Sequence, residues 1–250
     1  MPGAVSLCDD IVVRFQIGHE YPMSKTIVHC SGPVALVGGG QANAADVAEA
    51  LTFAKILVAV DGGLATALAC GITPAAVVGD MDSAPPEALA QIPPAHQHRI
   101  TEQYSTDFDK ALRHVEAPVV IGVGFCGGRV DHQLAAFHTL ANRCDRPCIL
   151  LAEHEVIAIV PPALSLAMMA GEVVSLFPLA PVTGRSTGLE WPLDGLKFDP
   201  VRLVGTSNRA KGPITLQMDA PGMLLIVPRR CLGLLVAHFC ADPVRWPAHA

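Results

Sequence analysis

Short, continuous apolar runs that end in glycine or aspartate recur through the first part of this chain. Five such runs lie at 33–40, 55–63, 75–80, 117–124 and 147–152. Because each run is apolar throughout, and not only at alternate positions, both faces of the strand that it predicts must be covered. Segments typical of helices alternate with the runs, at 42–51, 64–71, 106–115 and 131–144. The pattern predicts an α/β fold: an open, mostly parallel sheet with flanking helices.

The sequence changes in character near Pro161. Strand-like segments at 172–179, 213–219 and 222–229 are separated by Gly, Pro and Asp, with no convincing helix between them. This predicts a smaller all-β sandwich domain after the α/β part. The predicted division is an N-terminal extension and lead-in at 1–33, an α/β domain at 34–155 and a β-sandwich domain at 156–250.

Composition excludes several classes of protein. The chain is 51% hydrophobic, which is typical of a globular protein and not of a disordered one. With a net charge of −6, 5% aromatic residues and no basic stripe, nucleic-acid binding is not expected. No apolar run has the length needed to span a membrane. Asp9 and Asp10 precede the first short apolar segment, so no signal peptide is expected, and eight cysteines without a CxxC pair favour a reducing, cytoplasmic location.

Acidic and glycine residues gather where the predicted strands end. In an open parallel sheet, ligands bind beyond the carboxyl ends of the strands, so these loops are expected to meet at one edge. The second run ends in Asp61 and Gly62, the third in Asp80 and Asp82, and the fourth in "GFCGGRVDH" at 124–132.

The pair Asp80 and Asp82 can be interpreted in two ways. Mg²⁺ prefers carboxylate oxygens and is usually held by one or two carboxylates together with substrate phosphates. The alternative is a polar turn that closes a buried strand before Pro85 and Pro86. Asp107 has an alternative role too, because acidic residues favour the first turn of a helix.

The "GGRVDH" segment has the features of a phosphate-binding loop. Gly127 and Gly128 let the backbone approach a ligand, and the start of the next helix offers free N–H groups. Arg129 adds a planar fork of donors suited to phosphate oxygens. The alternative is a glycine turn with a surface arginine and with Asp131 as a helix cap. No Walker A motif is present, which disfavours a P-loop NTPase.

Five short motifs occur in an order and spacing that resemble those of the thiamine pyrophosphokinases, most closely the bacterial members. They are "VDGG" (60–63), "VVGDMDS" (77–83), "STDFDKAL" (105–112), "GGRVDHQLA" (127–135) and "GTSN" (205–208). The resemblance implies Mg²⁺-dependent transfer of pyrophosphate from ATP to thiamine, which gives thiamine diphosphate and AMP. It also implies a homodimer in which thiamine lies between the subunits.

The resemblance also implies roles for individual residues. Asp80, Asp82 and Asp107 match the Mg²⁺-binding acids, and Asp61 matches a further acid of the nucleotide site. Arg129 and Asp131 match the pair near the ATP phosphates. Apart from the resemblance, Lys110 is a candidate for phosphate contact, and the alternative is a lysine on the helix surface. Residues that match the thiamine-binding part are Ser207 and Asn208, with Trp191 in a stretch that is commonly aromatic in the family.

One position departs from the family pattern. Relatives usually carry an acidic residue three positions before the equivalent of Asp107, and here Tyr104 stands there. Tyr104 keeps open a second function, that of a non-catalytic sensor of a nucleotide or of thiamine diphosphate. A related pyrophosphokinase for another alcohol, such as a hydroxymethylpterin, stays open as well, because it would share the ATP and Mg²⁺ machinery of the α/β half.

Overall fold

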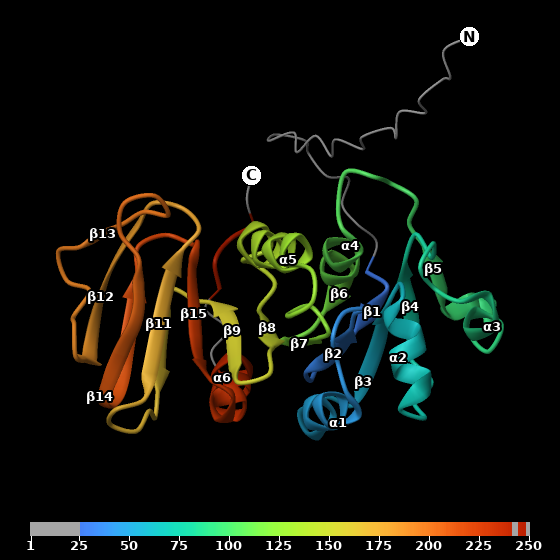
Figure 1. Ribbon diagram of the computed structural model, residues 1–250, viewed down its shortest axis with the longest axis horizontal. Coiled ribbons are helices and arrows are strands. Elements are labelled where there is room, and N and C mark those ends of the chain that lie inside the picture. The colour runs from blue at the N-terminus through green and yellow to red at the C-terminus, as the bar shows by residue number, and fades with distance from the viewer. Residues whose placement is uncertain (1–25, 242–244, 249–250) are drawn as a thin grey trace, which may run out of the picture.

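The parallel sheet predicted from the apolar runs forms one half of the molecule (Figure 1). The computed structural model describes residues 26–241 and 245–248, so most of the predicted extension at 1–33 lies outside the described residues. In spatial order, six strands pair in parallel: β5 (Gln97–Arg99), β4 (Ala76–Gly79), β3 (Ile56–Val60), β2 (Val34–Val37), β7 (Val120–Val123) and β8 (Cys148–Leu151).

Helices cover both faces of this sheet, as the continuous apolar strands require. On one face lie α1 (Ala44–Phe53) and α2 (Gly63–Ala69), and on the other lie α4 (Asp107–His114) and α5 (Val130–Asn142) (Figure 1). All four residues of β2 are fully buried between the layers. The remaining small elements near the sheet are α3 (Pro86–Leu89), the 3₁₀ turn at Pro94–His96, and a separate pair of parallel strands, β1 (Val28–His29) with β6 (Val115–Glu116).

The second half of the chain extends the same sheet with antiparallel strands. β9 (Glu155–Ile159) pairs antiparallel with β8, and β15 (Met223–Pro228), β11 (Val173–Pro178) and β14 (Gly205–Met218) follow in order. The first part of β14 pairs with β11, and its second part pairs with β10 (Ala163–Leu166) and β12 (Val182–Leu189); β13 (Lys197–Phe198) lies at the edge. The result is one mixed sheet that joins the two predicted domains.

The prediction that the second half is all-β was wrong in one element. After a 3₁₀ turn at Arg229–Cys231, the chain forms α6 (Leu232–Ala241). This helix is apolar around most of its circumference, so it lacks the polar stripe by which an amphipathic helix is recognised. Its buried side chains share the core with α1, on the same face of the sheet (Figure 1). Among the described residues, no helix is long and apolar enough to cross a membrane.

Gly63 is where a side chain would disturb this packing most directly. A Cβ at this position would lie 1.9 Å from the carbonyl oxygen of Val37 at the end of β2. The start of α2 therefore contacts the backbone of the neighbouring strand, and a backbone cannot move aside as a flexible side chain can. This close approach also fixes the turn that carries Asp61 and Gly62.

We expect Gly63→Ala to lower the free energy of unfolding by about 2 kcal/mol or more, as is typical of overpacking in a rigid core. Urea unfolding of the purified protein measures this change. Gly32→Ala is the matched control, because a Cβ at Gly32 has no neighbour within 4 Å and the backbone there is not left-handed. Equal stability of the two variants would contradict the packing described here.

Candidate active site

The order of the parallel strands reverses between β2 and β7, and glycine loops follow both strands at this point. In α/β sheets such a reversal opens a crevice in which ligands bind. The backbone N–H of Gly40 donates to the carbonyl of Gly124 at 3.1 Å. A Cβ on Gly40 would lie 2.5 Å from that same oxygen. The two loops therefore lie against each other, and glycine is required for the approach.

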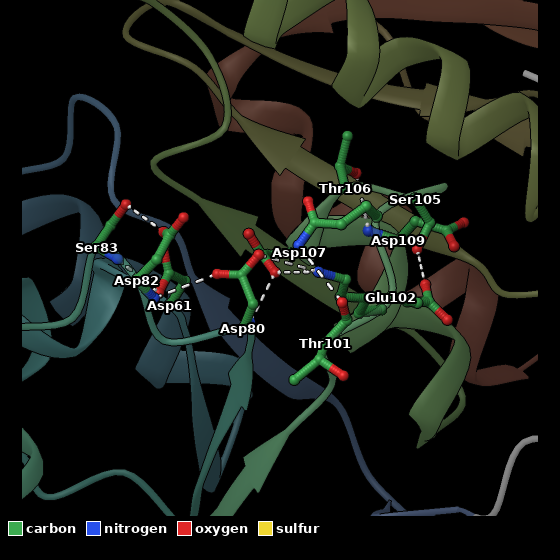
Figure 2. Close-up of polar contacts among 12 residues, drawn as sticks. Asp61, Asp80, Asp82, Ser83, Thr101, Glu102, Ser105, Thr106, Asp107 and Asp109 are labelled. Atoms are coloured by element: carbon green, nitrogen blue, oxygen red, sulfur yellow. Dashed lines mark hydrogen bonds and ion pairs between the residues drawn. The ribbon is translucent and has the colours of Figure 1, made fainter. Parts of the chain in front are cut away.

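Three carboxylates converge at the neighbouring strand ends. Asp61 follows β3, while Asp80 and Asp82 follow β4, and one oxygen from each lies within 4.8 Å of the others (Figure 2). The backbone is left-handed at Asp61, with φ of 46°, and at Met81, with φ of 65°. Non-glycine residues adopt this conformation at an energetic cost and frequently do so at functional sites. The turns thus direct three negative charges at one point.

Asp107, at the start of α4, joins the group through hydrogen bonds. Its Oδ1 accepts the backbone N–H of Asp80 at 3.1 Å. Gly79 makes this approach possible, because a Cβ there would lie 3.2 Å from Asp107 Oδ1 in a backbone with φ of 152°. The structure therefore brings together all four aspartates predicted from the sequence. The three carboxylates that converge most closely are those of Asp61, Asp80 and Asp82. The sequence analysis had instead grouped Asp107 with Asp80 and Asp82 as the metal ligands.

Lys110 lies beneath these carboxylates and not at the surface. Its side chain is 1% exposed, and its Nζ lies 2.9 Å from Asp107 Oδ1 and 3.4 Å from Asp80 Oδ2. The sequence suggested a phosphate contact for this residue. In this structure its two ion pairs are with carboxylates of the acidic group, by which we mean Asp61, Asp80, Asp82 and Asp107. The i, i+3 spacing between Asp107 and Lys110 could have indicated the pair with Asp107.

The surroundings shift the pKa values of two of these acids in opposite directions. Burial raises the pKa of Asp61, and the charges of Asp107 and Asp82 act in the same direction. Burial also acts to raise the pKa of Asp80, but the backbone N–H of Asp82 and the charge of Lys110 outweigh it and lower that pKa. Four carboxylates share one ammonium, so the group keeps an excess of negative charge. Oxygen ligands with such an excess fit a hard divalent cation.

A buried ion-pair network supports α4 on the side away from the acids. Thr106 caps the helix, with its hydroxyl accepting the N–H of Asp109 at 3.2 Å. Asp109 is 4% exposed and accepts two hydrogen bonds, of 2.7 and 3.0 Å, from Arg143 at the C-terminal cap of α5. This tie, which the sequence analysis missed, joins the helix of Asp107 to the helix that follows the "GGR" loop. Arg113 lies 3.6 Å from the same carboxylate.

Tyr104 is 46% exposed, and the nearby acid does not take the place of the missing carboxylate. Glu102 pairs with Arg113 at 2.7 Å and accepts the hydroxyl of Ser105, on the far side of Asp107 from the three converging acids (Figure 2). Hydrogen bonding to Glu102 also raises the pKa of Tyr104. Tyr104 therefore brings no carboxylate to this loop, and the charge of Glu102 is paired with Arg113.

The "GGR" loop has the open backbone that the sequence predicts. Gly127 and Gly128 have φ of 82° and 70°, in the left-handed region that glycine favours. Arg129 occupies the N-cap position of α5 without a side-chain capping hydrogen bond; it forms an ion pair with Asp131, and both side chains are exposed. Arg129, and not Asp131, is thus the residue that precedes the helix. The pair stands in solvent, where a guanidinium can exchange one anionic partner for another.

The three residues assigned to the β half form a second group. Asn208 is 5% exposed; its side chain donates to the carbonyl of Trp191 at 2.7 Å and accepts the N–H of Trp191 at 3.2 Å. It thus fixes the backbone of Trp191, whose own side chain is 55% exposed. Ser207 is left-handed, with φ of 62°, and its N–H donates to Ser175 Oγ at 2.9 Å.

Comparisons with known proteins agree with this arrangement. Residues 47–150 match the family model described as thiamin pyrophosphokinase, catalytic domain. Residues 160–222 match the model described as thiamin pyrophosphokinase, vitamin B1 binding domain. Thiamine pyrophosphokinase 2 of Oryza sativa subsp. japonica is 27% identical in an alignment 168 residues long, and the match covers 59% of this chain and 62% of the rice protein.

Solved structures with a similar fold carry the same family name. Thiamin pyrophosphokinase from Geobacillus thermodenitrificans superposes with a TM-score of 0.64 at 25% identity, covering 78% of this chain and 96% of that one. The Bacillus subtilis enzyme gives 0.63 at 22% identity, with coverage of 78% and 98%, and the Candida albicans enzyme gives 0.64 at 17% identity, with coverage of 84% and 97%. With both family models matched in order and over most of its length, the chain belongs to the thiamin pyrophosphokinase family.

Proposed function

We propose that this protein transfers pyrophosphate from ATP to the hydroxyl of thiamine, giving thiamine diphosphate and AMP. The observation that carries the proposal is the convergence of Asp61, Asp80 and Asp82 beside the glycine loops at the strand reversal. This acidic group lies in the part of the chain that matches the catalytic family model. The cytoplasmic location stays a prediction from the sequence.

A Mg²⁺ ion would be held by Asp80 and Asp82, with Asp61 and Asp107 beside them. When bound, it would neutralise part of the charge on the ATP phosphates, which an acidic site would otherwise repel. Arg129 and the N–H groups of Gly127 and Gly128 would bind phosphate oxygens. In doing so, Arg129 would exchange its partner Asp131, and the N–H of Gly127 would exchange Gln133 Oε1, to which it donates at 3.3 Å.

In the proposed reaction, the thiamine hydroxyl oxygen attacks the β-phosphorus of ATP. The bond from that phosphorus to the oxygen shared with the α-phosphorus breaks, and AMP leaves with the bond's electron pair. The hydroxyl proton passes to a base or to solvent. The protein's part is placement and charge stabilisation, and no covalent intermediate with the chain is needed. Asp107 is held in place for this task by Asp80 and Lys110.

Thiamine would bind at the second group, with Trp191 as an aromatic surface, Ser207 as a polar contact and Asn208 as the support for Trp191. Six strands separate β14 from β3 in the sheet order. At a spacing of about 4.8 Å per step, the seven steps between these two strands span roughly 34 Å along the sheet of one chain. One substrate cannot reach both, so we propose a homodimer in which the acids of one subunit face the β half of its partner.

The proposed activity is tested by incubating the protein with ATP, Mg²⁺ and a panel of alcohols, and measuring AMP release. We expect AMP with thiamine and no AMP with a hydroxymethylpterin. AMP release only with the pterin would favour a related pyrophosphokinase instead. Binding of ATP and thiamine without any AMP would favour a sensor, the alternative that Tyr104 keeps open.

We expect Asp82→Asn to lower kcat by about 10²-fold or more, a size typical of removing a key electrostatic group. The side chain of Asp82 is exposed, so thermal unfolding should change little. Glu153→Gln is the matched control, because this side chain is 87% exposed and has no part in the acidic group. Near-normal turnover of Asp82→Asn would contradict the proposed metal site.

The proposed shared site is tested by mixing two inactive variants, Asp82→Asn and Ser207→Gly. Glycine at 207 keeps the left-handed backbone and removes only the hydroxymethyl group. A mixed dimer would hold one site with both residues intact, so random exchange should restore about a quarter of wild-type activity, as expected for a two-fold symmetric pair. If acids and serine acted within one chain, mixing would restore nothing.

A further inference from the structure

We propose that Lys110 is an internal counter-cation for the acidic group, which weakens the binding of a divalent cation to the protein alone. The cation is then held firmly only together with the phosphates of the nucleotide. The inference rests on the proposed function, because it concerns the same site. It assigns Lys110 a positioning and tuning role in place of contact with substrate.

The first support is the burial of Lys110. A lysine side chain is almost never buried this fully unless it is paired. Lys110 is 1% exposed, and its ion pairs with Asp107 and Asp80 are 2.9 and 3.4 Å long. The two carboxylates belong to different elements, α4 and the loop after β4, so the ammonium joins the helix to the loop.

The second support is the chemistry of the position itself. Lys110 lies on the buried side of α4, where Phe108, Ala111 and Leu112 supply the apolar packing. A residue needed there for packing alone would be apolar, and methionine has a similar length and volume. An ammonium at this point therefore serves the carboxylates, and its cost of burial is offset only by their charge.

The third support is the balance of charge. Asp61, Asp80 and Asp82 repel one another at their separation of 4.8 Å or less, and Asp107 adds a fourth carboxylate. The ammonium reduces this repulsion, which keeps the loops in place when no metal ion is bound. The same positive charge repels a divalent cation at the neighbouring oxygens. Phosphates bring negative charge that compensates, so metal and nucleotide binding become coupled, and the coupling is reciprocal.

The test measures Mn²⁺ binding in the absence of nucleotide, by the electron paramagnetic resonance signal of free Mn²⁺. We expect Lys110→Met to bind Mn²⁺ at least about 10-fold more tightly than wild type, since repulsion between close charges is strong in a partly buried site. A non-hydrolysable ATP analogue should strengthen Mn²⁺ binding less in this variant than in wild type. Lys55→Met, at an exposed lysine of the same half, is the control and should match wild type.

Lys110→Gln separates charge from hydrogen bonding and serves as a second variant if Lys110→Met does not fold. Its amide can still donate to a carboxylate, but the positive charge is gone. We expect it to bind Mn²⁺ more tightly than wild type as well. Thermal unfolding should show a larger rise in Tm on adding Mn²⁺ for both variants than for wild type.

Unchanged or weaker Mn²⁺ binding in both variants would overturn the inference. The inference would also be overturned if the two variants lowered Tm by the same amount with and without Mn²⁺. A lysine with a purely structural role would stabilise the metal-free and the Mn²⁺-bound protein equally, so its loss would lower Tm alike in both. These outcomes are distinct from failure of the proposed function. If wild-type protein bound no Mn²⁺ even with the ATP analogue, the metal site itself would be wrong, and the role of Lys110 would fall with it.

Discussion

Repulsion among the carboxylates at the ends of β3 and β4 is the constraint on which this site depends. Three carboxylate oxygens within 4.8 Å are costly unless a cation compensates them, and within the described part of the chain Lys110 pairs with just one of the three, Asp80, and with Asp107 beside them. Left-handed backbone at Asp61 and Met81 adds to this cost. A site with such features is unfavourable for folding alone, which is why we interpret it as one built to bind a cation and a polyanion together.

The surrounding fold keeps these groups in place. Parallel strands buried on both faces bring their carboxyl ends to one edge, and close backbone contacts at Gly40 and Gly63 fix the loops there. On the other side of the site, the Asp109–Arg143 ion pair joins α4 to α5. The helix that carries Asp107 and the helix that follows the "GGR" loop are thereby held together, which a reaction needing both metal ligands and phosphate contacts would require.

The sequence allowed the parallel half to be predicted well, because continuous apolar runs and glycine-rich strand ends are direct consequences of a covered sheet. It did not reveal α6, which is apolar around most of its circumference, or the polar first part of β14, where "GTSNRAKG" shows no strand alternation. The four aspartates were identified, but their partners were not. The sequence offered Lys110 as a phosphate contact or a surface lysine, and its ion pairs with Asp107 and Asp80 follow from the packing of α4. Asn208 holds the backbone of Trp191, which lies 17 residues away in the chain. Such contacts depend on tertiary packing, which local patterns do not encode.

The central claim is that the acidic group binds the nucleotide only through a divalent cation. Calorimetric titration of ATP into the protein, with Mg²⁺ and with EDTA in its place, tests this most directly. The account predicts saturable binding with Mg²⁺ and none with EDTA, because ATP and the aspartates repel each other without a bridging cation. Equal ATP affinity under the two conditions would contradict it.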